Sequence, residues 1–144
     1  MNILTYYTES HKQLFERFFK ASIDRSGEFT ICATYEDKLE GGTFQTPQWY
    51  SAVKKKPEIV LRYMQSNTGR FVFSDVDVIQ VQPIKKEIEV LLDKYDAVFQ
   101  DEKHDMHVNS GFYAMNINET TLRFMKQVVQ QYDQYCGGAL VIKV

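Results

Sequence analysis

Residues 71–80 read FVFSDVDVIQ, and this stretch decides the fold. An apolar run of strand type ends in Asp75 and Asp77, two carboxylates separated by a single valine. Packing alone does not account for two charged groups at the end of a buried run, because burying an unpaired charge is costly. In open α/β sheets, ligands bind outside the carboxyl ends of the strands. The stretch therefore predicts a buried strand that ends at a binding site.

The spacing of the two aspartates indicates what they bind. Residues two apart in an extended chain point to the same side, so Asp75 and Asp77 are expected to lie together. A hard divalent cation relieves their mutual repulsion, and oxygen ligands suit Mg²⁺ or Mn²⁺. A bare D-x-D pattern is common by chance, and a solvated turn is the alternative interpretation. The apolar strand before the pair and the proline-initiated helix after it favour the metal site.

Short apolar runs alternate with helical periodicity along the chain, which is typical of an α/β domain. Strands are expected over residues 3–7, 29–35, 70–74, 96–100, 111–115 and the final ALVIKV, and helices from near Ser10, Thr46, Pro83 and Asn118. The spacing of Ser10 and Gln13 predicts a capping box at the first helix. Pro57 predicts a kink in the second helix, or its division into two.

Composition limits the partners and the compartment. The 144 residues carry a net charge of −2 with no basic stripe, so nucleic acid is not an expected partner. No stretch approaches the roughly 20 apolar residues of a membrane span. Cys32 and Cys136 lack the spacing of a metal or redox motif, and reduced thiols fit a cytoplasmic protein. The length predicts one domain over residues 1–144.

Two motifs together resemble those of a known family. FVFSDVDVIQ resembles the Asp-x-Asp segment of nucleotide-diphospho-sugar transferases with the GT-A glycosyltransferase fold, and NSGFYAMN at residues 109–116 resembles that family's second signature. The lysine-bearing helix with Lys56 and the Asp133-Gln134 pair resemble two further, shorter features of the family. The resemblance covers residues 29–134. Family domains continue past the Asp-Gln pair, whereas YCGG and ALVIKV follow it here, so the acceptor region is expected to be missing or replaced.

The resemblance implies a single Rossmann-like GT-A domain with a mixed, mostly parallel sheet flanked by helices. It implies a metal-dependent glycosyltransferase that moves a sugar from a UDP- or GDP-sugar to a glycan or protein acceptor. Mn²⁺ or Mg²⁺ would bridge the donor diphosphate, with Asp77 as a direct ligand. Asp75 would contact the ribose, or the metal through water, and Lys56 would face the diphosphate or the base. A metal and a lysine stabilise the charge that develops on the departing nucleotide.

The same resemblance assigns the remaining contacts. The donor site would comprise Thr5, Tyr6, Tyr7, Lys56, Asp75, Val76, Asp77, Asn109, Ser110, Gly111 and Gln134, and Asp133 would act as a base toward an acceptor hydroxyl. Tyr6 and Tyr7 should face opposite sides of their strand, and packing is the alternative role for both. For Lys56, the alternative is that it lies on a solvated helix face and has no role in binding. Glycine at position 111 permits close approach of a ligand to the backbone.

Other functions compete with this hypothesis. Asp101, His104, Asp105 and His107 could ligate a transition metal, but their spacing matches no standard zinc pattern and a polar loop is the better interpretation. Phosphatases of the haloacid dehalogenase type also use Asp-x-Asp, with the first aspartate as nucleophile, but normally on the first strand. The segment TYYTESHK lacks the glycine-rich loop of nucleotidyltransferases. A non-catalytic or degenerate nucleotide-sugar-binding domain is the alternative from a different class.

Overall fold

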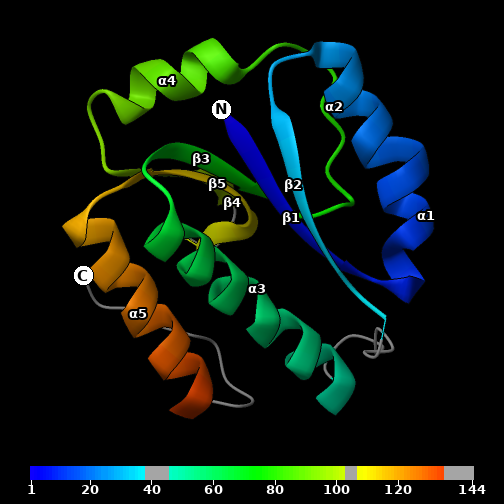
Figure 1. Cartoon of the computed structure of the whole chain (residues 1–144), viewed down its shortest axis with the longest axis vertical. Coiled ribbons are helices and arrows are strands. Elements are labelled where there is room, and N and C mark those ends of the chain that lie inside the picture. The colour runs from blue at the N-terminus through cyan, green and yellow to red at the C-terminus, as the bar shows by residue number, and fades with distance from the viewer. Residues whose placement is uncertain (38–45, 103–106, 135–144) are drawn as a thin grey trace.

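Five strands form the sheet at the centre of the computed structural model, which describes residues 1–37, 46–102 and 107–134 (Figure 1). They are β1 (Asn2–Thr8), β2 (Thr30–Glu36), β3 (Gly69–Ser74), β4 (Ala97–Glu102) and β5 (His107–Ile117), in the spatial order β2-β1-β3-β5-β4. β1 pairs in parallel with β2 and β3, whereas β5 pairs antiparallel with β3 and β4. Among the described strands only β5 is reversed, which confirms the predicted mixed, mostly parallel sheet.

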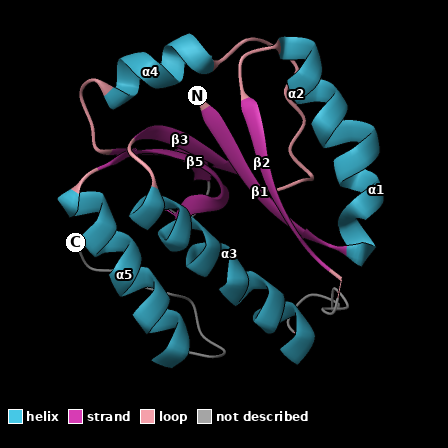
Figure 2. Ribbon diagram, in the orientation of Figure 1, coloured by secondary structure: helices cyan, strands magenta, loops and turns pink. Residues whose placement is uncertain are grey.

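Helices cover both faces of this sheet (Figure 2). α3 (Pro47–Ser66) and α5 (Glu119–Gln134) pack together on one face. The other face carries α4 (Lys85–Leu92) and a helical segment made of α1 (Lys12–Leu14), a π-helical turn (Phe15–Phe19) and α2 (Lys20–Ser26). The expected α/β architecture is therefore present. None of the described helices is long and apolar enough to cross a membrane.

Strand alternation divides the buried residues between two cores. Phe71 and Phe73 of β3 point toward α3 and α5, where they pack with Val60, Met64, Met115 and Met125. Val72 points to the opposite face and packs with Ile3, Phe19, Ile23, Ile88, Leu92 and Ala114. β3 is buried on both faces at the centre of the sheet, so the residue that follows it leaves the core at a defined place.

Two of the predicted helix caps, at Thr46 and Asn118, are confirmed. The side chain of Thr46 accepts a hydrogen bond from the Trp49 amide at 3.3 Å, and Pro47 is the first helical residue of α3. Asn118 accepts a hydrogen bond from the Thr121 amide at 3.0 Å and directly precedes α5. Each side-chain oxygen satisfies an amide that has no partner within its own helix.

Other predicted helix features differ from the structure. Ser10 makes no capping bond, because its hydroxyl bonds to Thr8 and His11 within a 3₁₀ turn (Glu9–His11). α3 runs unbroken through the buried Pro57, so its division into two helices is wrong. α4 begins at Lys85, two residues after the predicted start at Pro83. The final ALVIKV, predicted as a strand, lies outside the described residues.

Candidate functional site

The predicted site residues meet at the edge of the sheet where β1 and β3 end. β1 ends at Thr8 and β3 at Ser74, and these two strands are parallel. Because β5 runs in the opposite direction, its first residues return to the same edge. The Asp75 amide donates a hydrogen bond to the Gly111 carbonyl at 2.7 Å. The fold thus brings the Asp-x-Asp segment against the Asn-Ser-Gly segment, although 36 positions separate Asp75 from Gly111 in the chain.

Lys56 and Asp75 form the central ion pair of this site. Asp75 continues the alternation of Phe71 and Phe73, so its side chain lies on the face covered by α3, where Lys56 is located. The ammonium lies 2.7 Å from each carboxylate oxygen, and the two side chains are only 26% and 24% exposed. The geometry is that of a hydrogen bond toward Oδ2 alone, so Oδ1 is a buried acceptor without a hydrogen-bond donor.

Burial dominates the electrostatics of Asp75. It raises the pKa of the Asp75 carboxyl above the ordinary value of 3.8, while the charge and hydrogen bond of Lys56 oppose that increase. The nearby carboxylate of Asp77 raises the pKa further, and His11 lowers it. Lys56 is therefore the main reason that a charged Asp75 is tolerated at this depth.

The methionine variant Lys56→Met should make folding stability more dependent on pH. Without the ammonium, the pKa of Asp75 rises further, so the folded state disfavours the charged carboxylate more strongly. Below pH 3.8 the carboxyl is protonated in both states and this penalty is absent; it grows as pH rises through the raised folded pKa. We expect a loss of about 1–3 kcal/mol at neutral pH, the cost of an unpaired buried group. Urea unfolding between pH 3.5 and 8 measures it.

The neighbouring variant Lys55→Met is the matched control. Lys55 pairs with Glu58 at 3.5 Å on the exposed side of α3, and an exposed pair of this kind contributes little to stability. Equal losses in both variants at every pH would contradict the role assigned to Lys56.

Asp77 lies in a different environment from Asp75. The chain leaves the strand at Asp75 and turns, with the Val78 amide donating to the Asp75 carbonyl at 3.3 Å. Val76 is buried in the core, whereas Asp77 is exposed and makes no hydrogen bond or ion pair with the described residues. The expectation that strand alternation places both carboxylates on one side does not apply, because the chain is not extended there.

Gly111 fits closely between two side chains of the site. A Cβ atom at this position would lie 2.8 Å from Oδ2 of Asp75 and 2.9 Å from Oδ1 of Asn109. Asn109 also accepts a hydrogen bond from the Gly111 amide at 2.6 Å, which fixes the turn of the chain before β5 meets β3. Ser110 between them is exposed. A glycine is needed here because the Asp75 carboxylate occupies the space of a side chain.

The three predicted donor-site residues of β1 differ in their environments. Thr5 and Tyr6 are buried, and their hydroxyl groups have no hydrogen-bond partner among the described residues. Burial and the nearby Glu36 raise the pKa of Tyr6 to about 12, so its hydroxyl stays protonated. Tyr7 faces the opposite way, as predicted, and stacks on Phe15 with ring centroids 4.3 Å apart. The Tyr7 ring is therefore engaged in packing.

Some predicted residues are not brought into this cluster. The Val76 side chain is in the core, so it can reach a donor only through its backbone. Asp133 and Gln134 end α5, but their side chains lie outside the described part of the structure. In the predicted polar loop, Asp101 belongs to β4 and His107 begins β5, while His104 and Asp105 lie outside the described residues.

Sequence reasoning missed one group of polar residues at this edge. The Thr8 and Ser10 hydroxyls are 3.0 Å apart, and Ser10 contacts Nδ1 of His11 at 2.9 Å. His11 is close enough to lower the pKa of Asp75. The detectable signal was the polar run TESH directly after the first strand, where a parallel strand delivers residues to the binding edge.

Comparison with known proteins decides the family. The family model described as nucleotide-diphospho-sugar transferase matches residues 19–138, which is most of the chain. The chain belongs to this family. Its assignment supports an enzyme that transfers sugars, implies a nucleotide-sugar donor, and favours the transferase interpretation over the phosphatase alternative. No curated protein matches the sequence.

Solved structures support the fold of this transferase. A glycosyltransferase involved in the glycosylation of the major capsid of PBCV-1 superposes with a TM-score of 0.58 at 16% identity, covering 92% of this chain and 67% of that one. The apo-form glycosyltransferase GlyE of Streptococcus pneumoniae TIGR4 gives a TM-score of 0.54 at 9% identity, covering 93% of this chain and 38% of that one. At such low identities the likeness concerns the fold alone.

The residues of the candidate site are compatible with a divalent cation. The described residues contain no group of three or more acidic, histidine or cysteine side chains that could hold a metal by themselves. Mg²⁺ in enzymes that bind phosphates is usually held by one or two carboxylates, substrate oxygens and waters. The exposed carboxylate of Asp77 and the unused Oδ1 of Asp75 provide such an incomplete set. A donor diphosphate would be required to complete it.

Proposed function

We propose that this protein binds a UDP- or GDP-sugar together with Mn²⁺ or Mg²⁺ and transfers the sugar to a glycan or protein acceptor. The observation that carries the proposal is the joining of Lys56, Asp75 and Gly111 beside the exposed Asp77 at one edge of the sheet. These are the chemical groups that a metal–diphosphate complex requires, located where ligands of α/β sheets bind.

Charge decides the roles within the site. Asp77 is the residue available to ligate the cation directly, because it is exposed and not paired with another described residue. Asp75 is already neutralised by Lys56, so it serves as an oriented acceptor for the ribose or for a metal-bound water. The cation, when bound, neutralises the diphosphate of the departing nucleotide. Lys56 adds a second positive charge at the same edge.

The rest of the donor site follows from burial. The buried hydroxyls of Thr5 and Tyr6 are groups whose unused hydrogen-bonding capacity suits a nucleoside, whereas Tyr7 is occupied by Phe15. Asn109 and Ser110 stand next to Gly111 and are proposed to contact the sugar. The roles of Gln134 toward the donor and of Asp133 as a base toward the acceptor stay predictions from the sequence.

A non-catalytic nucleotide-sugar-binding domain is the second candidate. It would bind the donor at the same edge of the sheet without transferring the sugar. The chain spans 67% and 38% of the two glycosyltransferase structures to which it is similar. The donor-binding edge is common to both candidates, so binding and turnover must be measured separately.

A nucleotide-sugar screen tests the proposal. Thermal unfolding is measured with UDP- and GDP-sugars, each with and without Mn²⁺, and released nucleotide is measured in the same mixtures. Metal-dependent stabilisation by at least one donor, with slow donor hydrolysis, is the expected result. Stabilisation without hydrolysis or transfer would favour the binding domain. The absence of stabilisation by every nucleotide would overturn both candidates.

A further inference from the structure

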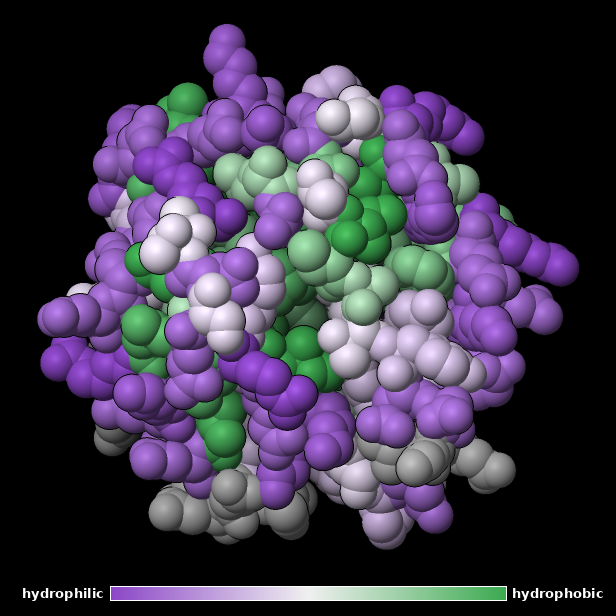
Figure 3. Space-filling model, in the orientation of Figure 1, coloured by the Kyte–Doolittle hydropathy of each residue, from purple (hydrophilic) through white to green (hydrophobic). Residues whose placement is uncertain are grey.

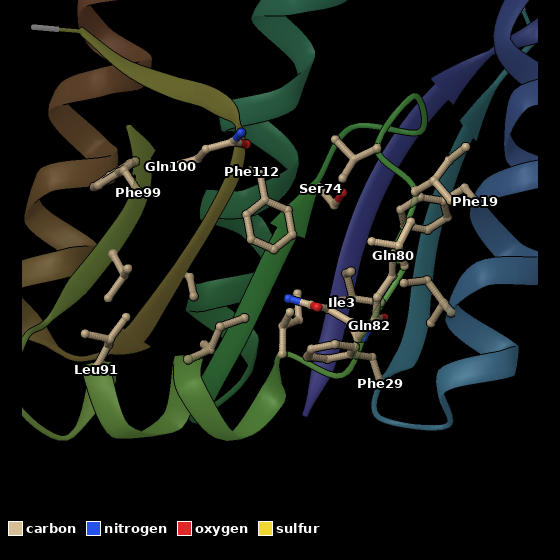
Figure 4. Close-up of a pocket in the computed structure, with 18 residues that line it drawn as sticks. Ile3, Phe19, Phe29, Ser74, Gln80, Gln82, Leu91, Phe99, Gln100 and Phe112 are labelled. Carbon is tan, nitrogen blue, oxygen red and sulfur yellow. The ribbon is translucent and has the colours of Figure 1, made fainter. Parts of the chain in front are cut away.

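The segment from Asp75 to the start of α4 contains no helix or strand, and it carries Asp77. Residues 78–82 help to line an apolar cavity of about 420 Å³ between α2 and α4, together with Phe19, Phe29, Ile88 and Phe112 (Figure 4). Figure 3, in the orientation of Figure 1, shows hydrophobic residues in green near the middle of the face that it presents. Ile79 is 50% and Val81 89% exposed, so apolar packing holds this segment only weakly.

Hydrogen bonds to Glu28 hold the far end of the segment. The Glu28 carboxylate accepts from the Ile84 amide at 2.9 Å, from the Lys85 amide at 3.3 Å, and from the side-chain amide of Gln80. α4 lacks a side-chain cap of its own at Ile84, so Glu28 provides the cap from a distant part of the chain. A carboxylate is well suited to that place because a helix N-terminus is electropositive.

The local fold directs Glu28 toward this position. Gly27 ends α2 in the left-handed conformation with φ of 65°, and its amide bonds to the Ile23 carbonyl. Glu28 follows at once, with its amide on the Ser26 hydroxyl at 3.3 Å. In the same helix, buried Ser22 accepts a hydrogen bond from the Gln80 backbone amide at 3.2 Å. These two contacts of Gln80 therefore lead to α2 and to the turn that follows it.

Anchored residues flank Asp77 on both sides in the chain. Val76 is buried immediately before it, and Gln80 is fixed three residues after it. A short loop anchored at both ends has few conformations, so the direction of the Asp77 carboxylate depends on both anchors. Loss of the Gln80 anchor would leave the carboxylate free to sample many positions before a cation binds.

We propose that Glu28 is a positioning residue for Asp77: through Gln80 and the start of α4 it holds the Asp77 carboxylate where a diphosphate-bound cation needs it. This inference rests on the proposed function and extends it to a residue 49 positions away in the sequence. Residues that orient a metal ligand through hydrogen bonds commonly alter metal affinity by about 10–100-fold when replaced.

The test measures nucleotide affinity with and without metal. Calorimetry with UDP and with GDP, at a temperature well below unfolding, gives the gain in affinity that Mn²⁺ confers; the free Mn²⁺ signal in electron paramagnetic resonance gives an independent reading. The alanine variant Glu28→Ala should reduce that gain about tenfold and leave metal-free nucleotide affinity unchanged. Glu28→Gln keeps one carbonyl oxygen for the Ile84 amide and should recover part of the gain.

A second variant and a control separate positioning from folding. Gln80→Leu removes the side-chain bond to Glu28 but leaves the cap of α4, and it should also reduce the gain. Glu87→Ala changes an exposed glutamate in the first turn of α4 and should behave as the wild type. The inference would be overturned, and the proposed function left standing, if the affinity gain from Mn²⁺ were unchanged in both Glu28→Ala and Gln80→Leu. The same holds if these variants lost as much nucleotide affinity without metal as with it. A wild-type protein that gains nothing from Mn²⁺ would overturn the proposed function as well.

Discussion

The variant Asp77→Ala is expected to lose the whole metal-dependent part of nucleotide binding while remaining folded. Asp77 is exposed and makes no hydrogen bond or ion pair with the described residues, so its removal should change the unfolding free energy by less than about 0.5 kcal/mol. The cation would retain only the partly buried Asp75, whose charge is already used by Lys56. Calorimetry with UDP and GDP should then give the same affinity with and without Mn²⁺.

The control for this prediction is Asp24→Ala. It makes the same chemical change on α2, where the aspartate pairs with Lys20 on the surface, and such exposed pairs contribute little. This variant should keep the wild-type metal dependence. If Asp77→Ala retained an undiminished gain from Mn²⁺, Asp77 would not be the metal ligand and the role assigned to it would have to be abandoned.

The second large effect is expected from Gly111→Ala. The new methyl group would lie 2.8 Å from the Asp75 carboxylate and 2.9 Å from the Asn109 side chain, closer than real Cβ contacts allow. Both neighbours are side-chain ends, so the backbone need not move, and we expect a loss of only about 1–3 kcal/mol. The Asp75 carboxylate must leave its place beside Lys56, however, so metal-dependent nucleotide affinity should fall at least about tenfold.

Comparison with a substitution in the same strand distinguishes a local from a general effect. Val108 is exposed near the start of β5, and Val108→Ala adds no atom near Asp75. It should leave both stability and nucleotide binding close to wild type. A Gly111→Ala protein that binds the nucleotide–Mn²⁺ pair normally would mean that the placement of Asp75 against Gly111 is unimportant for the site.

Much of the fold could be predicted because local sequence carries it. Alternation and apolar runs identified β1, β2, β3 and β4 with small errors at their ends, since each strand is defined by residues within a few positions of one another. The caps at Thr46 and Asn118 are local for the same reason. The Asp-x-Asp and Asn-Ser-Gly motifs were predicted to belong to one site from their resemblance to two signatures of one family, in the family's order and at a compatible separation.

The failures have a common cause, which is that distant contacts override local preferences. The π-helical turn at Phe15–Phe19 buries Phe19 and stacks Phe15 on Tyr7, and no pattern within the helix predicted it. Pro57 is accommodated within an unbroken α3. α4 starts at Lys85 because Glu28, which lies between α2 and β2 in the chain, caps it there.

The sequence by itself determined the class of the protein. An apolar strand ending in two aspartates and a later Asn-Ser-Gly turn are local patterns, and their resemblance to the motifs of nucleotide-diphospho-sugar transferases indicated the family that the family model also matches. Only the tertiary structure decided where each carboxylate lies. Strand alternation carries Asp75 under α3 onto Lys56 and against Gly111, whereas a turn exposes Asp77. That division depends on packing between segments far apart in the chain, and such contacts leave no signal in the short pattern D-x-D.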